Sequence, residues 1–369
     1  MRNRNDSKRP WFLGASAALA LSALSVSSSA ADVGTTIAKD SVQVNAFTYN
    51  VFKGDFDKWS WVPKLEFRAN GPIPSGSQLY AEFTVPGAAS VKFDCPTRET
   101  VKGHHWDSQC GARDVPEEKA TQYTGKVSFA IKMRNELNNS DVTLFSGKVT
   151  ISKVHSNEAG PKAANKWVYF ADDDWNLPIG YLYYTADEVR AWDLPTLHAT
   201  FWVRGEAVRF EPHLFFGAQE VGKMMYQGGE VGKASCESEL DKQTTQFVDD
   251  KVPQKAKWSR VRCDFPNVRK WDKTKQAPGP FGALYQMAKN PGAYELKVLW
   301  QNHLARSIKF NVDADGKFDD SISKQNNLGS ERAIVPVGVL GDQDGKWDKT
   351  AWKTDAFYGN PLTGFKAAQ

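Results

Sequence analysis

The four cysteines are the residues whose chemistry is most directly constrained by their spacing. The chain of 369 residues contains Cys95, Cys110, Cys236 and Cys263. Cysteines that bind zinc or carry out redox chemistry usually stand as Cys-x-x-Cys, and no two of these four have that spacing. Structural disulfides are therefore expected. Three pairings are possible, and an internal repeat with one cysteine pair in each copy favours Cys95–Cys110 and Cys236–Cys263.

Two acidic turns contain carboxylates that could bind calcium. The candidate ligands are Asp313, Asp315 and Asp319 in the first turn and Asp342, Asp344 and Asp348 in the second. Both turns depart from a calcium-binding loop, because the fifth position is Lys, the Gly comes two places early and no Glu closes the loop. Asp-Gly is also a common hairpin signal. Hairpin turns are the favoured interpretation, with calcium as the alternative and no other cofactor expected.

Motifs of the major enzyme classes are missing from the sequence. There is no Gly-x-Ser-x-Gly elbow for a nucleophile, no Gly-rich phosphate loop and no dinucleotide fingerprint. His104 and His105 are adjacent, so in a strand their side chains would point to opposite faces, and no metal-binding His spacing accompanies them. Carboxylates that are distant in sequence can still pair for glycoside hydrolysis. A hydrolase with dispersed carboxylates is the least favoured alternative, and no catalytic residue is predicted.

Aromatic residues offer the remaining candidate binding site. The rings in question are Trp59, Trp61, Trp175, Tyr181 and Tyr183. Trp59 and Trp61 would share one face of a strand, as would Tyr181 and Tyr183. Exposed rings beside Asp and Asn suit a sugar, which stacks on a ring and hydrogen-bonds through its hydroxyls. The competing interpretation is that the rings pack a connector against two domains.

The stretches around these residues alternate apolar and polar side chains, as half-buried strands do. Residues 125–135 and 292–302 both open with Gly and reach an Asn turn. Further landmarks recur in one order, including Pro-containing strands at 59–67 and 192–201. This shared order indicates a duplication. Because no helical periodicity is evident, each copy is predicted to be an antiparallel sandwich.

One strand resembles a known family. The phrase Pro-Gly-x-Tyr-x-Leu-x-Val at Pro291–Val298 is similar to the penultimate strand of immunoglobulin-like and fibronectin-like domains, where the Tyr anchors a corner. The resemblance covers one strand and its hairpin, and the first copy has Val127 in place of the Tyr. With the strand pattern, it predicts an all-β chain of two tandem immunoglobulin-like antiparallel β-sandwich domains with an ordered aromatic-rich connector and a C-terminal extension.

The N-terminus is typical of a secretory signal. Four basic residues precede an apolar run from Trp11 to Val26, and small residues follow as far as Ala30. The predicted division is 1–30 signal peptide, 31–44 leader, 45–158 first sandwich, 159–191 aromatic and acidic connector, 192–314 second sandwich and 315–369 C-terminal extension. No later stretch is apolar for long enough to span a bilayer, so no transmembrane segment is expected after cleavage.

The charge distribution argues against a nucleic-acid partner. The formal net charge is +4, and residues 1–30 carry four basic and one acidic residue, so cleavage leaves about +1. The basic residues between Arg260 and Lys275 are interrupted by Asp264 and Asp272, whereas a nucleic-acid surface needs a concentrated basic patch. We therefore expect an exported, non-catalytic binding or structural module in the periplasm or outside the cell. Its partner would be a protein or surface, with carbohydrate binding through exposed aromatic residues as the alternative.

Overall fold

The computed structural model shows a chain built almost entirely of β-strands. It describes residues 34–50, 59–112, 115, 119–155, 167–185, 196–205, 209–222, 234–241, 258–270, 285–328 and 332–368. The predicted signal peptide lies outside the described residues. Strands pair antiparallel, apart from one short parallel pair between β16 and β17, which confirms the predicted all-β antiparallel class. No helix in these ranges is long and apolar enough to cross a membrane.

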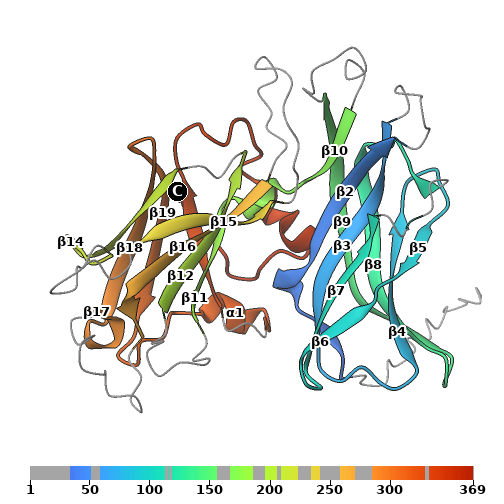
Figure 1. Cartoon of the computed structure of the whole chain (residues 1–369), viewed down its shortest axis with the longest axis horizontal. Coiled ribbons are helices and arrows are strands. Elements are labelled where there is room, and N and C mark those ends of the chain that lie inside the picture. Colours follow the sequence, from blue (N-terminus) through green and yellow to red (C-terminus); the bar gives the residue numbers. More distant parts are fainter. Residues whose placement is uncertain are drawn as a thin grey trace, which may run out of the picture. The chain divides into compact units, whose positions relative to one another are not determined.

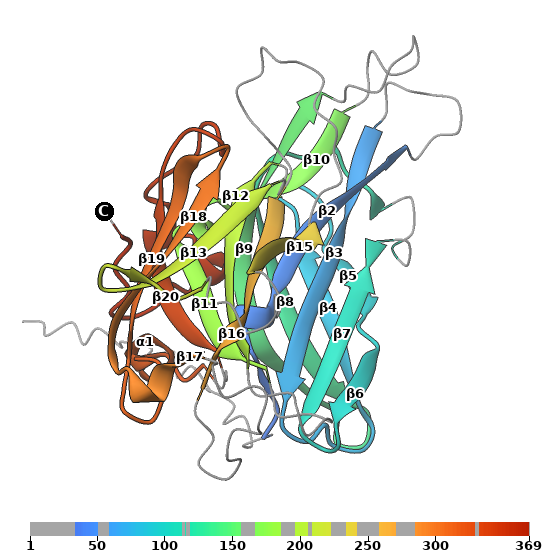
Figure 2. The same ribbon diagram turned by 60° about the vertical axis from the view of Figure 1, so that its left-hand side comes forward.

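The first half of the chain forms strands β1 to β10 (Figure 1). Their bounds are β1 (Thr36–Ile37), β2 (Gln43–Asn50), β3 (Trp59–Asn70), β4 (Ser77–Thr84), β5 (Val91–Asp94), β6 (Thr97–Val101), β7 (His105–Gly111), β8 (Gly125–Asn135), β9 (Ser140–His155) and β10 (Trp167–Asp172). One sheet has the order β1-β3-β7-β6, with β2 also paired to β3, and the other has the order β10-β9-β8-β4-β5. Strands β2, β3 and β7 lie side by side in both Figure 1 and Figure 2.

Strand β8 shows why these residues form a sheet with one buried face. Val127, Phe129, Ile131 and Met133 are buried, and the side chains between them are more exposed. The ring of Phe129 stacks on Phe83 of β4, with their centroids 5.4 Å apart. Burial of one such side chain contributes roughly 1.5–3 kcal/mol, so this alternation fixes which face of the sheet points inward.

The second half of the chain forms strands β11 to β20. Their bounds are β11 (Ile179–Tyr184), β12 (Thr196–Arg204), β13 (Phe210–Phe216), β14 (Gln219–Glu220), β15 (Ser235–Asp241), β16 (Trp258–Arg269), β17 (Tyr285–Gln286), β18 (Gly292–Trp300), β19 (His303–Val312) and β20 (Ala333–Val339). They hydrogen-bond in the order β14-β13-β18-β19-β20-β11-β12-β16-β15, with β17 beside β16.

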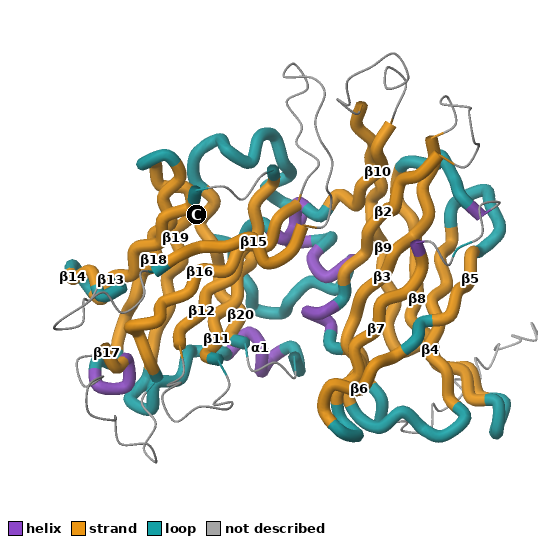
Figure 3. Tube along the Cα trace, in the orientation of Figure 1, coloured by secondary structure: helices purple, strands orange, loops and turns teal. Residues whose placement is uncertain are grey.

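Helical segments are short, as Figure 3 shows in purple. They are α1 (Ser321–Gln325) and the 3-10 turns η1 (Lys39–Ser41), η4 (Asp174–Asn176), η6 (Met287–Lys289), η7 (Ala351–Lys353) and η8 (Ala356–Tyr358). Most of them stand between strands or in the C-terminal segment, where they turn the chain rather than build a layer.

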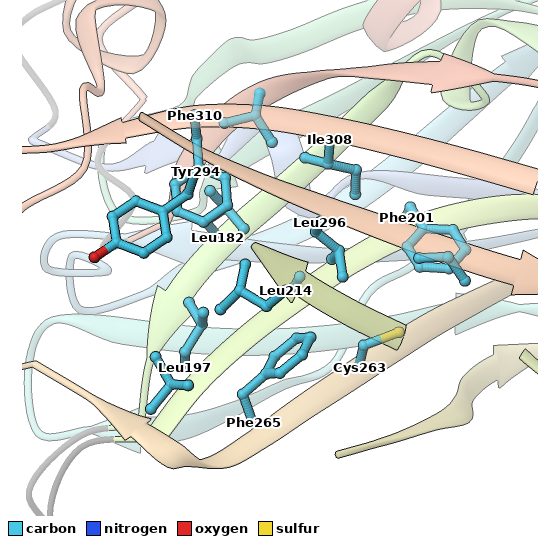
Figure 4. Close-up of a cluster of buried hydrophobic side chains, with 14 of the residues drawn as sticks. Leu182, Leu197, Phe201, Leu214, Cys263, Phe265, Tyr294, Leu296, Ile308 and Phe310 are labelled. Atoms are coloured by element: carbon cyan, nitrogen blue, oxygen red, sulfur yellow. The ribbon is translucent and has the colours of Figure 1, made fainter. Parts of the chain in front are cut away.

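The core of the second half is formed by buried side chains of its paired strands. Figure 4 shows Leu182, Phe201, Phe265, Leu296 and Ile308 gathered in one cluster, and none of them is more than 1% exposed. They come from β11, β12, β16, β18 and β19. One continuous apolar cluster therefore holds these strands together.

Both halves contain the same run of strand pairings. In the first half β4 pairs with β8 and β8 with β9, and in the second β13 pairs with β18 and β18 with β19. Strands β8 and β18 begin at Gly125 and Gly292, which have φ of 121° and 142°. The Asn turn predicted after β18 contains Gln301 and Asn302, both with positive φ, as a two-residue hairpin of type I′ requires.

Tyr294, the residue that carries the family resemblance, is an anchor in the second half. Its side chain is 2% exposed, and its hydroxyl donates to the carbonyl oxygen of Asn290 at 2.7 Å. The hydroxyl of Tyr285 lies 3.0 Å away. The phenol is therefore tied to backbone only four residues upstream.

The two disulfides have the predicted pairing but different positions. Cys95, which follows β5, is joined to Cys110 on β7, so this bond links the two sheets of the first half. Cys236 and Cys263 face each other on the neighbouring strands β15 and β16. The predicted pairing is confirmed, but one bond joins two sheets and the other joins two adjacent strands of one sheet.

The connector and the C-terminal segment contribute strands to the sheets. Within the predicted connector, β10 pairs with β9 of the first half and β11 pairs with β12 of the second. Within the predicted extension, β20 lies between β11 and β19. Segments that the sequence places outside the sandwiches are therefore parts of their sheets.

Removal of either disulfide should lower the free energy of unfolding by an amount that depends on the length of the loop that the disulfide closes. The sequence separations are 15 and 27 residues. We expect Cys95→Ala with Cys110→Ala to lose about 3 kcal/mol of unfolding free energy, and Cys236→Ala with Cys263→Ala about 3.5 kcal/mol. Urea unfolding under non-reducing conditions measures both. A loss below about 1 kcal/mol would contradict the chain-entropy argument.

Candidate functional site

Three of the five predicted ligand-binding rings are buried. Trp61 is 1% exposed, Trp175 4% and Tyr181 7%. The indole N–H of Trp61 donates to the carbonyl oxygen of Tyr123 at 2.8 Å. Trp175 packs against Tyr358, with ring centroids 5.5 Å apart. A ring with so little exposed surface offers no face on which a sugar could stack.

The other two rings are partly buried and stand on strands of different halves of the chain. Tyr183 stacks on His198, with centroids 4.9 Å apart, and the guanidinium of Arg332 lies 4.8 Å from the Tyr183 centroid. Trp59 begins β3 in the first half, whereas Tyr183 belongs to β11 in the second. These contacts favour the packing interpretation of the aromatic residues.

Four of the six predicted calcium ligands, Asp313, Asp319, Asp344 and Asp348, use their carboxylates to bind the backbone of their own turns or a buried cation. Asp313 Oδ1 accepts from the backbone N–H of Asp315 at 2.9 Å, Asp319 Oδ1 accepts from Ser321, and Asp348 Oδ1 accepts from Thr350. Asp342 uses its carbonyl oxygen to accept from Gly345. In the part of the chain that the structure describes, no three His, Cys, Asp or Glu side chains gather as a metal site requires.

Asp344 is the acidic partner of a buried cation. Its Oδ1 lies 2.7 Å from Nη2 of Arg306, a residue that is 0% exposed. The same oxygen accepts from the backbone N–H of Arg204 at 2.8 Å. Arg306 also donates to the carbonyl oxygens of Trp202 and Ala305. This carboxylate therefore joins the segment after β20 to β12 and β19.

A second group of carboxylates surrounds Arg204. Its Nη1 lies 3.4 Å from Asp174 Oδ1, and its Nη2 lies 3.7 Å from Asp172 Oδ1. Asp174 Oδ2 accepts from the backbone N–H of Asp348 at 2.6 Å. Burial raises the pKa of Asp174 to about 7, and the charge of Arg204 opposes that rise. Because these carboxylates are enclosed and already hold Arg204 and the backbone, their arrangement supports the fold.

The structure also contains an open groove, which is lined by none of the carboxylates described above. It has a volume of about 640 Å³. The lining residues come from β1 and η1, the end of β3, the start of β7, β9, the stretch after α1 and the C-terminal segment, namely Thr36, Ile37, Ala38, Lys39, Asn70, Gly71, His104, His105, Phe145, Asn326, Asn327, Leu328 and Asn360. Segments from both halves of the chain therefore build it.

Several polar side chains in the groove have no structural task within the described residues. No hydrogen bond is formed there by the side chains of Asn70, His104, His105 or Asn327. Asn70 Oδ1 is buried without a partner. His104 and Asn327 are exposed, so their donors and acceptors face water. The exposed side chains of His104 and Asn327 are therefore available to a ligand.

The backbone of β1 adds a further donor and acceptor. Thr36 is opposite Asn70 in the ladder with β3, and the N–H of Ala38 donates to Arg68 at 2.9 Å. In an antiparallel ladder the residue between two such positions points its backbone groups the other way. The N–H and C=O of Ile37 therefore point away from β3, at the open edge of β1.

Gly71 shapes the wall of the groove. Its φ is +86°, and a Cβ atom at this position would lie 2.1 Å from the carbonyl oxygen of Gly34. The turn can come this close to the leader only because the residue has no side chain. No sequence pattern links the four lining Asn residues, because Asn70 stands more than 250 positions before Asn326, Asn327 and Asn360. Of the lining residues, only His104 and His105 form a sequence pattern of their own, an adjacent pair without the further His spacing of a metal site.

No protein-family model matches the chain, and no significant match is found among curated protein sequences.

The buried pair of Arg306 and Asp344 should be essential for stability. Asp344→Asn removes the charge that offsets a fully buried guanidinium, and we expect a loss of about 3–5 kcal/mol in unfolding free energy. The matched control is Asp320→Asn, which breaks the exposed ion pair with Lys324, 2.7 Å long. That control should change stability very little, because exposed pairs are screened by water. Equal losses in the two variants would contradict this assignment.

Asp174 should make stability depend on pH between about 4 and 7. Its pKa is raised to about 7 in the folded chain, mainly by burial, and is about 3.9 when unfolded. The folded state therefore binds more protons in that window, and the unfolding free energy should fall as pH rises through it. Urea unfolding at several pH values should show a shallower fall for Asp174→Asn.

Asp348→Asn is the matched control for that experiment. Hydrogen bonds from Thr350 lower the pKa of Asp348. Its stabilising effect is present above its unfolded pKa and is lost as pH falls, so this variant changes the slope in the opposite sense and below about pH 4. An unchanged slope between pH 4 and 7 in Asp174→Asn would show that Asp174 ionises normally.

Proposed function

We propose that the chain is a non-catalytic glycan-binding protein of the cell envelope or extracellular space, with the groove as its binding site. The observation that supports this is the lining, which has four Asn and two His side chains and no carboxylate among its described residues. Amide and neutral imidazole groups each combine donors with acceptors, as sugar hydroxyls do. The volume of about 640 Å³ falls within the range of small-ligand sites.

Apolar groups in the lining suit the C–H surfaces of sugar rings. Ile37, Phe145 and Leu328 interrupt the polar side chains. Phe145 is partly exposed and packs on Phe129, with centroids 5.9 Å apart. A ligand with alternating hydroxyl and C–H surface would match both parts of the lining.

The same lining supports binding without cleavage. Hydrolysis of a glycosidic bond normally uses two carboxyl groups that flank the bond. The described lining residues of the groove supply neither. The enclosed carboxylates Asp172 and Asp174 are engaged by Arg204. A hydrolase with dispersed carboxylates is therefore not favoured.

In this proposal, the protein is an exported chain of two tandem immunoglobulin-like sandwiches, and the groove is its binding site. The short backbone anchor of Tyr294 resembles the corner tyrosine of that fold, and the repeated strand pairings support a duplicated unit. Two disulfides and the signal-like N-terminus support an oxidising compartment. The partner would then be a surface polysaccharide, which is the alternative that the sequence offers beside a protein or surface partner.

Binding of oligosaccharides to the full-length mature protein tests this function. We expect signals on an array of neutral and acidic oligosaccharides, with dissociation constants measured by calorimetry for those that bind. His104→Ala with Asn327→Gly should weaken binding about tenfold or more, because two hydrogen-bonding side chains are lost. Gly is chosen because Asn327 has φ of 49°.

His303→Ala with Asn302→Gly is the matched control. Both residues are exposed in the hairpin between β18 and β19, and Asn302 has φ of 64°. This variant also replaces one His by Ala and one Asn by Gly, but outside the groove, so it should bind like the unmodified protein. Absence of binding to every oligosaccharide, with capture of a protein partner instead, would reject the glycan proposal. Equal weakening in both variants would place the binding site elsewhere.

A further inference from the structure

Lys39 gives the groove a positive charge without a counter-charge. Its ammonium lies 5.5 Å from the ring centroid of Phe357, and burial lowers its pKa. Within the described residues it makes no ion pair with a carboxylate, and no charged group contributes to its pKa shift. A partly buried ammonium has lost part of its hydration and gains most from an anion placed beside it.

Carboxylates that stand near lining residues in the sequence, among them Asp40, Glu99 and Asp107, do not line the groove. Asp107 Oδ1 accepts from Nε of Arg68 at 3.2 Å, and Glu99 accepts from the backbone N–H of Gly103. Burial raises the pKa of Asp40, with Arg332 and Arg68 opposing that rise. None of these carboxylates lines the groove. The uncompensated charge at the groove is therefore positive.

We propose that the groove selects glycans that contain uronic acid residues, with Lys39 binding the sugar carboxylate. This inference rests on the glycan-binding function proposed above and specifies the chemical class of the ligand. The amides of Asn70 and Asn327 bind hydroxyls along the same sugar chain, and His104 and His105 supply further ring nitrogens. A charge-assisted hydrogen bond from an ammonium to a carboxylate is stronger than a neutral one, so it adds selectivity to contacts that any sugar could make.

The groove is large enough for Lys39 and the amide side chains to bind neighbouring sugar units at the same time. A volume of about 640 Å³ holds more than one sugar unit, and Lys39 shares the lining with the exposed side chains of His104 and Asn327. The carboxylate of one unit can therefore meet the ammonium while the hydroxyls of its neighbour meet the amides. Cleavage is not involved, so no group is transferred and the ligand leaves unchanged.

A pair of ligands that differ only in charge tests the selectivity. The probes are an oligogalacturonate and the same oligomer with its carboxylates methyl-esterified, titrated into the full-length mature protein by calorimetry. We expect the acid to bind about tenfold to a hundredfold more tightly than the ester, as one charged hydrogen bond implies. The difference should shrink in high salt if the charge remains partly open to solvent.

Substitution of Lys39 assigns the difference to its ammonium. Lys39→Gln should bring acid and ester to the same affinity, and Lys39→Arg should restore part of the preference because it restores the charge. The matched control is Lys353→Gln, since the Lys353 ammonium lies 5.6 Å from the ring of Trp352 and does not line the groove. The thermal unfolding midpoint of each variant shows whether loss of a cation–π contact has altered the fold.

The outcomes separate this inference from the function on which it rests. Equal binding of acid and ester by the unmodified protein overturns the selectivity and leaves glycan binding intact. A preference that survives Lys39→Gln in a folded variant overturns the role of Lys39. Binding of neither probe, together with no binding to the oligosaccharide array, removes the proposed function and this inference with it.

Discussion

The buried guanidinium of Arg306 is the constraint on which much of the structure depends. A cation with no exposed surface requires a counter-charge and a partner for its N–H groups, because water cannot reach it. Asp344 supplies the charge and also accepts from the backbone of Arg204, so one carboxylate holds two strands, β12 and β19, that are not paired with each other. Asp344 belongs to the segment that follows β20. The last part of the chain must therefore return over the second half and cannot extend freely from it.

From this point the C-terminal segment joins the two halves and completes the groove. The backbone N–H of Asp348 meets Asp174 of η4, and the hydroxyl of Tyr358 accepts from the backbone N–H of Val44 in β2. Two residues later, Asn360 donates to the carbonyl oxygen of Ser146 on β9 and contributes its side chain to the groove lining. The groove is thus a consequence of how the segment is held, since three of its four lining Asn residues come from sequence that follows β19.

The features that could be predicted from sequence are those that depend on local pattern. The alternation of Val127, Phe129 and Ile131 predicts a strand with one buried face, and cysteine spacing with the repeat predicts both disulfides. Exposure of aromatic rings depends instead on contacts with distant segments. Trp175 stands in an acidic turn that looks exposed, yet it is covered by Tyr358, more than 180 positions later in the printed sequence. No local pattern predicts that contact. The same reason explains Asp344, which has the sequence context of a hairpin turn and the structural role of a buried counter-charge.

The amides of the groove divide into two kinds, and that division supports a binding role. Asn326 bonds through both its nitrogen and its oxygen to residue Thr363, and Asn360 donates to two backbone carbonyls, so these side chains hold the C-terminal segment in place. Asn70 and Asn327 have no such bonds within the described residues: Asn327 is exposed, and Asn70 Oδ1 is unpaired although a buried amide oxygen is normally satisfied. Fixed amides give the groove its shape, and unbonded amides beside them keep their hydrogen-bonding capacity. A site held rigid by one set of side chains loses little entropy when another set binds a ligand, which is the physical requirement for recognition by a few neutral hydrogen bonds.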